Sequence, residues 1–124
     1  MIILITGSRA ATRKMRDFAE RCVRKAKTDG HTVITGDAYG VDEATATECQ
    51  KLGVPLIVYA KTPNPIHGTK GVAYRWDFNS YTERDRAMVD VADQVVCIWD
   101  GKSPGTKLVY EYAEKIGKIV SIHT

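Results

Sequence analysis

The sequence has few cysteines, and they do not form pairs. Cys22, Cys49 and Cys97 are the only three in 124 residues. Their odd number and wide spacing do not suggest a disulfide framework. No histidine stands at a metal-ligand spacing from them, so we expect no metal site. The pattern is typical of reduced, buried thiols, and we therefore expect a cytoplasmic protein.

Long hydrophobic runs and a strong excess of one charge are also missing. Residues 1–5 are too few for the apolar core of a signal peptide. No run approaches the roughly 20 residues that cross a bilayer, so we expect no membrane partner. The net charge of +3 suits an anionic small ligand but is weak for a polyanion-binding face. We therefore do not expect nucleic acid among the partners, and we interpret the basic side chains of residues 13–27 as a solvated helix face.

Short β-branched segments alternate with amphipathic ones along the chain. We predict strands at 2–5, 32–35, 55–59, 94–99 and 118–122, and helices from residue 11 or 12 to 29 and at 41–52, 81–91 and 106–116. The last helix should bury one face, formed by Leu108, Val109, Tyr112, Ala113 and Ile116. This order predicts an α/β fold, a Rossmann-like three-layer sandwich with a mostly parallel five-stranded sheet and helices on both faces.

Residues 60–79 differ from the rest of the chain. They hold two prolines, two glycines and several aromatic residues, and they are too many for a simple connection. Loops of this length are usually lids, binding loops or interface segments. A packed aromatic flap without a ligand is the alternative.

Three glycine-rich loops follow predicted strands. The candidate ligand-binding residues in them are Thr6, Gly7, Ser8 and Arg9, then Gly36, Asp37, Ala38, Gly40 and Asp42, then Asp100, Gly101, Ser103, Gly105 and Thr106. The carboxyl ends of parallel strands share one edge of the sheet, and ligands bind at that edge. The third loop also opens a helix, whose free N–H groups and dipole attract anions. We therefore expect the loops to converge on a phosphate-bearing ligand.

Each candidate also has a plainer explanation. Asp42 stands where a helix N-cap belongs, whereas Asp37 has no evident structural duty and is the better candidate for a ribose hydroxyl or a base edge. The loops themselves are alternatively ordinary strand-to-helix turns, and the third is alternatively a capped helix start. The helix at 81–91 adds Arg84, which lies nearer the helix start than Arg86 and is our choice of ligand cation. Asp85 beside it could accept a hydrogen bond.

These segments together resemble the SLOG superfamily. The resemblance rests on Thr6-Gly7-Ser8-Arg9, Gly36-Asp37-Ala38-Tyr39-Gly40-Val41-Asp42, Arg84-Asp85 with Met88, Ala92-Asp93 and Asp100-Gly101-Lys102-Ser103-Pro104-Gly105-Thr106. It covers nearly the whole chain and is strongest to the small YspA-type branch. It implies one SLOG-like nucleotide-ligand-binding domain over residues 1–124, a homodimer or higher homo-oligomer, and no cofactor. It also implies that Gly105 and Thr106 hold a phosphate.

The superfamily includes binders of ADP-ribose-type signals, the lonely-guy phosphoribohydrolases, and the DNA-processing protein A group, which binds single-stranded DNA. Lonely-guy enzymes have a catalytic glutamate three residues after the Gly-Thr pair, where this chain has Val109. Many relatives also have two glycines where this chain has Gly36-Asp37. The leading hypothesis is therefore a sensor or sequestering protein for a nucleotide-derived molecule.

Two alternatives remain open. One is a nucleotide hydrolase or transferase of the lonely-guy or deoxyribosyltransferase type, which cleaves an N-glycosidic bond, with Asp37, Asp85 or Asp100 as candidate catalytic residues. The other is a DNA-binding module similar to DNA-processing protein A, which the basic first helix supports.

Overall fold

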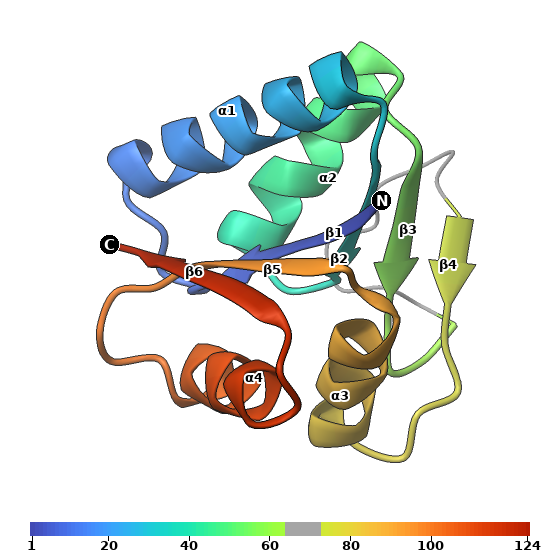
Figure 1. The fold of residues 1–124 in the computed structure, drawn as a ribbon, viewed down its shortest axis with the longest axis vertical. Coiled ribbons are helices and arrows are strands. Elements are labelled where there is room, and N and C mark those ends of the chain that lie inside the picture. Colours follow the sequence, from blue (N-terminus) through green and yellow to red (C-terminus); the bar gives the residue numbers. More distant parts are fainter. Residues whose placement is uncertain (64–72) are drawn as a thin grey trace.

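The computed structural model describes residues 1–63 and 73–124 of the chain. Strands and helices alternate along most of it (Figure 1). The strands are β1 (Ile2–Gly7), β2 (Thr32–Gly36), β3 (Leu56–Tyr59), β4 (Ala73–Arg75), β5 (Gln94–Ile98) and β6 (Ile119–His123), and the helices are α1 (Arg13–Asp29), α2 (Val41–Leu52), α3 (Tyr81–Val91) and α4 (Pro104–Lys115).

The strands form one parallel sheet in the order β4-β3-β2-β1-β5-β6. From β1 the chain moves outward through β2, β3 and β4, and then returns to place β5 on the other side of β1. The strand order therefore reverses between β1 and β5. In open α/β sheets, ligands bind beyond the carboxyl ends of the strands at such a reversal.

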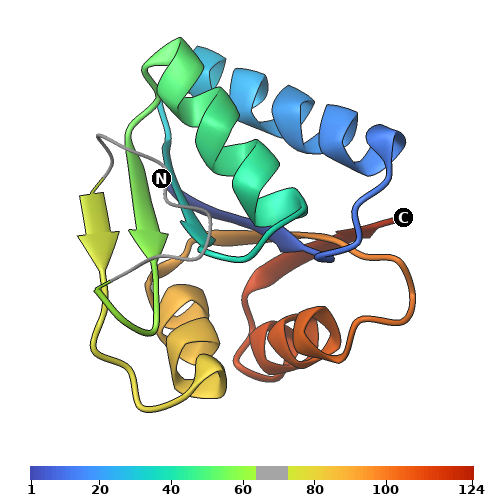
Figure 2. The same cartoon turned by 180° about the vertical axis from the view of Figure 1, so that it is seen from behind.

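Helices α1 and α2 cover one face of the sheet, and α3 and α4 cover the other (Figures 1 and 2). Alternate side chains of β1 serve the two layers, because successive residues of a strand point to opposite faces. Ile3 and Ile5 pack in the buried cluster with α1 and α2, and Leu4 packs in the cluster with α3 and α4. The predicted α/β Rossmann-like sandwich with helices on both faces is confirmed.

Side chains fix the starts of two helices at the predicted positions. Thr12 caps α1 by accepting a hydrogen bond from the backbone N–H of Met15 at 3.2 Å. Ser80 caps α3 by accepting one from the N–H of Glu83 at 3.1 Å. The carboxylate of Glu83 in turn accepts from the N–H of Asn79 at 3.1 Å, so the reciprocal bond of the capping box lies one residue earlier than usual.

The predicted number of strands is wrong, because the sheet contains a sixth strand within the predicted long loop. The three residues of β4 pair in parallel with the end of β3. This edge strand is short and largely exposed, so it leaves no alternating apolar pattern in the sequence. Phe78, which follows it, stacks on Tyr59 with ring centres 5.9 Å apart. The middle of the predicted loop lies outside the described residues, and its predicted role as a lid, binding loop or interface stays a prediction.

The predicted apolar face of the last helix is only partly buried. Val109 and Ala113 lie in the core, whereas Leu108 is 56% exposed and Ile116 41% exposed. Helix α4 lies near the edge of the sheet, so the strands cover only part of the apolar face of this helix. None of the described helices is both long and apolar enough to span a bilayer.

All three cysteines are free thiols. Cys49 and Cys97 are buried and Cys22 is half-buried. Burial raises the pKa of Cys49 and of Cys97 to about 12. These two thiols are therefore protonated at neutral pH and act as small apolar core groups.

Candidate functional site

A pocket of about 380 Å³ opens where the carboxyl ends of β1, β2 and β5 meet α3 and α4. Its volume falls in the range of roughly 300–1,000 Å³ that is usual for small-molecule sites. We call it the loop pocket. Its lining residues are Thr6, Gly7 and Arg9 after β1, Ala38 and Asp42 after β2, Tyr81, Arg84 and Asp85 on α3, and Ser103, Pro104, Gly105, Thr106 and Val109 at the start of α4. The three glycine-rich loops thus converge on one pocket.

Most of the predicted site residues line this pocket, but six of the candidates do not. The structure brings together Thr6, Gly7, Arg9, Ala38, Asp42, Arg84, Ser103, Gly105 and Thr106, whereas Ser8, Gly36, Asp37, Gly40, Asp100 and Gly101 lie outside its wall. Of the candidate catalytic carboxylates Asp37, Asp85 and Asp100, only Asp85 lines it. Sequence reasoning missed Tyr81, which lines the pocket from the start of α3, because its place in the chain gave no sign of this contact.

Ser8 and Asp100 hold the loops together instead of facing the pocket. Ser8 is fully buried, its hydroxyl accepts a hydrogen bond from the N–H of Asp100 at 2.9 Å, and its carbonyl accepts one from the N–H of Val41 at 3.2 Å. The carboxylate of Asp100 accepts bonds from the N–H groups of Ser103 and Lys102, both at 2.8 Å. These bonds lower the pKa of Asp100, and they fix the loop that leads into α4.

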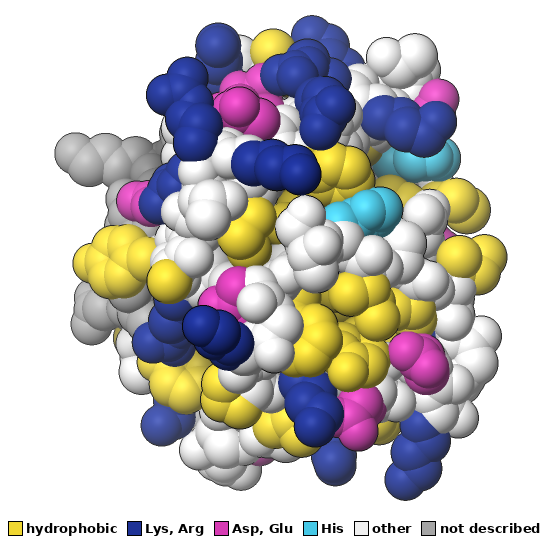
Figure 3. Space-filling view, turned by 90° about the vertical axis from the view of Figure 1, so that its left-hand side faces the viewer, with side chains coloured by type: hydrophobic (Ala, Val, Ile, Leu, Met, Phe, Trp, Pro, Cys, Tyr) yellow, Lys and Arg dark blue, Asp and Glu magenta, His cyan; other side chains and the backbone are white. Residues whose placement is uncertain are grey.

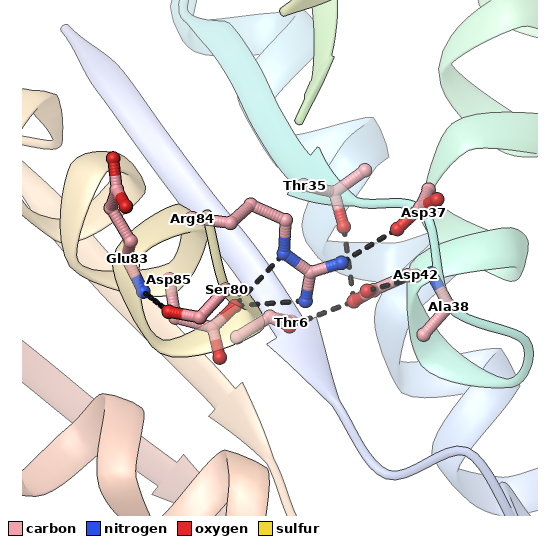
Figure 4. A network of polar contacts seen from close by, with 9 residues as sticks. All are labelled: Thr6, Thr35, Asp37, Ala38, Asp42, Ser80, Glu83, Arg84 and Asp85. Carbon is pink, nitrogen blue, oxygen red and sulfur yellow. Dashed lines mark hydrogen bonds and ion pairs between the residues drawn. The ribbon is translucent and has the colours of Figure 1, made fainter. Parts of the chain in front are cut away.

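Arg84 is the centre of a buried network of charges (Figure 4). Its guanidinium donates to Asp37 at 2.6 Å and, through two nitrogens, to one oxygen of Asp85 at 3.1 and 2.8 Å. The side chain is only 7% exposed. Burial alone would lower the pKa of Arg84, but Asp85 and Asp42 outweigh it and raise that pKa. Arg84 therefore interacts mainly with carboxylates of the protein itself. Asp37, for which the sequence showed no structural role, is one of its ion-pair partners.

Asp42 connects the first two loops. It is 1% exposed and accepts hydrogen bonds from the hydroxyls of Thr6 at 2.7 Å and Thr35 at 3.2 Å, and from the N–H of Ala38 at 3.3 Å. It is not the N-cap of α2, which is Gly40. Burial raises the pKa of Asp42 more than the nearby Arg84 lowers it, and the pKa of Asp85 is raised for the same reason.

Two glycines make this arrangement possible. Gly40 has φ +84°, and a Cβ there would collide with the backbone carbonyls of Ser8 and Arg9. A Cβ at Gly36 would lie 2.5 Å from the carboxylate of Asp42 and 3.1 Å from a guanidinium nitrogen of Arg84. The loop after β2 therefore needs these glycines for close packing rather than for contact with a ligand.

The start of α4 offers donors that make no hydrogen bond to a described residue. Its N-cap residue, Ser103, donates its hydroxyl to Asp100 at 3.1 Å and makes no capping bond. The N–H groups of Gly105 and Thr106 have no hydrogen bond to a described residue. Thr106 is only 5% exposed, and its hydroxyl also has no described partner while it lines the pocket. These groups, together with the dipole of a twelve-residue helix, suit an anion.

The rest of the wall is mixed in character. The second oxygen of Asp85 accepts no hydrogen bond from a described residue, so it can accept one from a ligand. Val109 lines the pocket at the position where lonely-guy enzymes would carry their glutamate, so this part of the wall is apolar. Within residues 1–63 and 73–124, no cluster of three or more histidine, cysteine or acidic side chains is placed to hold a metal ion.

Comparison with solved structures shows which proteins share this fold. DNA processing protein A from Helicobacter pylori superimposes with a TM-score of 0.82 at 18% identity, over 98% of this chain and 64% of that one. The molybdenum cofactor binding protein from Rippkaea orientalis gives 0.86 at 21% identity, over 98% and 74%. The molybdenum cofactor carrier protein from Chlamydomonas reinhardtii gives 0.81 at 21%, over 98% and 75%. At these identities the likeness establishes the fold alone, and this chain spans less than two thirds of the Helicobacter protein.

Comparison with sequences connects the chain with DNA-processing proteins. No curated protein sequence matched it. The model of the family described as DNA recombination-mediator protein A matches residues 1–68, which include the first two glycine-rich loops. The Helicobacter structure was determined for its single-stranded DNA binding. Our expectation that nucleic acid is not among the partners is therefore wrong, because it rested on net charge alone. The superfamily suggested by the loop motifs fits these findings, and the chain belongs to the DNA recombination-mediator protein A family.

Proposed function

We propose that the protein binds a nucleotide-type small molecule in the loop pocket, as a sensor or a sequestering protein. The observation that carries the proposal is the unused set of donors at the start of α4. The hydroxyl of Thr106 and the backbone N–H groups of Gly105 and Thr106 have no described partner, and both residues line the pocket. A phosphate would accept hydrogen bonds from all three donors at once.

The rest of the pocket wall supports a ligand that also carries hydroxyl groups. The free oxygen of Asp85 and the apolar side chain of Val109 suit a ribose and its neighbouring ring. A nucleoside monophosphate combines both requirements in one molecule. Within its family, we propose that the chain is a SLOG-type domain of the YspA-type branch, and that ADP-ribose derivatives belong among the ligands to be tried.

The experiment is calorimetry of the purified protein with AMP, ADP-ribose, adenosine and inorganic phosphate. We expect AMP to bind and adenosine to bind at least about tenfold more weakly, because a charge-assisted hydrogen bond contributes about 1.5–3 kcal/mol. Chromatography of the mixture for released adenine separates binding from cleavage of the N-glycosidic bond. No heat with any nucleotide, or equal affinity for adenosine and AMP, would refute the proposal.

A second candidate function is binding of single-stranded DNA, which the family favours. Helix α1 supports it, since its seven basic and three acidic residues give a net charge of +4, compared with +3 for the whole chain. Figure 3 shows Lys and Arg side chains gathered at the top of one face, where α1 lies. Some of them are paired, such as Arg24 with Glu48 at 3.2 Å. Lys14 and Arg21 have no ion pair to a described residue.

Anisotropy of a fluorescent oligothymidylate at several salt concentrations tests this second function. Each neutralised phosphate contributes about 0.7 to the slope of log K against log salt for a single strand. We expect the double variant Lys14→Gln with Arg21→Gln to bind more weakly and to lower the slope by about 1.4. The control Lys51→Gln removes an exposed charge from the end of α2. Equal binding by the double variant and the control would contradict the role of α1.

A further inference from the structure

The mouth of the loop pocket holds an aromatic ring surrounded by three cations. Tyr81 is the first residue of α3, and its side chain lines the pocket. The guanidinium of Arg84 lies 4.9 Å from the centre of the ring, the ammonium of Lys61 lies 5.4 Å away, and the guanidinium of Arg9 lies 5.9 Å away. These cations come from three separate segments, so the fold itself brings them to one place.

Among the described residues, only Arg84 of these three cations forms ion pairs, while Arg9 acts on Asp85 from a longer distance. Arg84 is bound by Asp37 and Asp85 (Figure 4). Neither Arg9 nor Lys61 forms an ion pair with a described residue, although exposed lysines and arginines elsewhere on the chain do. A ring face attracts a cation only weakly at an exposed site, and like charges gathered at one ring repel each other. An anion bound beside the ring would offset this repulsion.

We propose that Arg9 and Lys61, placed over Tyr81, form a second anion-binding position at the mouth of the pocket. The ligand then carries two phosphates on one nucleotide framework. The first binds at the start of α4 and the second at this position. The proposal rests on the proposed function, and it deepens that function by naming the charge and length of the ligand. A nucleoside diphosphate and a two-nucleotide piece of a single strand share this chemistry.

Calorimetry of wild type and variants with AMP, ADP and the dinucleotide d(pApA) tests the proposal. In wild type, we expect ADP or d(pApA) to bind about tenfold more tightly than AMP, equivalent to about 1.4 kcal/mol. We expect Lys61→Gln to bring that ratio close to one. Lys61→Arg, which keeps the charge, should preserve it. The matched control Lys51→Gln, in the last turn of α2, should also preserve it.

The outcomes separate this inference from the proposed function. If AMP binds but neither two-phosphate ligand binds more tightly, the second position does not exist and the first remains. If the gain persists in Lys61→Gln, Lys61 does not form the position and the inference fails. If none of the three ligands binds, both proposals fall. A gain with only ADP or only d(pApA), lost in Lys61→Gln, supports the inference and identifies the source of the second phosphate.

Discussion

Replacing Thr106 by valine tests the anion site with the least disturbance of the fold. Valine keeps the shape of threonine and replaces the hydroxyl with a methyl group. This hydroxyl has no described partner, and it lines the pocket at the start of α4. The folded protein therefore loses no internal hydrogen bond in the Thr106→Val variant. We expect its free energy of unfolding to stay within about 0.5 kcal/mol of wild type.

The cost of this change should appear in ligand binding. A hydrogen bond to a charged acceptor contributes about 1.5–3 kcal/mol. The affinity for AMP should therefore fall roughly 10- to 100-fold. The affinity for adenosine should change much less, because adenosine brings no phosphate to the start of α4. Calorimetry measures both affinities, and urea unfolding measures stability.

Thr45 provides a matched control within the same chain. Its side chain on α2 is fully buried, its hydroxyl has no hydrogen-bond partner among the described residues, and it does not line the loop pocket. Thr45→Val should raise the free energy of unfolding by about 1 kcal/mol, because it removes an unsatisfied buried hydroxyl. It should leave the affinity for AMP unchanged. The reasoning is refuted if Thr106→Val keeps the wild-type affinity for AMP, or if both variants lose affinity equally.

Three further changes test the network and the helix start. Arg84→Gln leaves Asp42 and Asp85 buried without their cation and should cost about 3–5 kcal/mol at pH 8. In the folded protein, the pKa values of both carboxyls already lie above the ordinary value of 3.8, which also holds in the unfolded chain. Without Arg84 they rise further. Stability then falls as the pH rises through this window, so the loss measured by urea unfolding should be smaller at pH 5 than at pH 8. Gly36→Ala places a methyl group 2.5 Å from the carboxylate of Asp42 and should cost about 2 kcal/mol or more, and an unchanged urea midpoint would contradict this. Gly105→Ala meets nothing within 4 Å, so it should keep or raise stability by up to about 1 kcal/mol while weakening AMP binding in calorimetry.

The fold was predictable because its signals are local. The β-branched runs of β1 and β5 and the apolar spacing of the helices involve residues within a few positions of each other. The strand β4 was not predicted because its three residues are mostly exposed and pair only through their backbone. Leu108 was misplaced for a related reason. Helical spacing shows that an apolar face exists, but it does not show how far the sheet extends to cover that face.

The site was predictable only where the backbone itself is involved. Glycine-rich turns after parallel strands indicate where a ligand approaches, and those loops do converge. Which side chain faces the pocket depends on contacts across the chain. Arg84 and Asp37 are 47 residues apart and bind each other, so neither side chain is kept for a ligand in the way that the sequence suggested. Their pairing left no pattern in the sequence.

The balance of charge in the loop pocket limits what can bind there. Asp42 and Asp85 line the pocket with Arg84. Asp37, which does not line it, forms an ion pair with that arginine. The part of the pocket formed by Asp42, Arg84 and Asp85 is therefore acidic overall, whereas the cations around Tyr81 make the mouth basic. The opposite side, at the start of α4, presents unused donors. A site with these two sides favours a ligand with an anionic end and a hydroxyl-bearing end over free phosphate, and it also sets the orientation of that ligand, with the phosphate at α4 and the hydroxyl groups at Asp85.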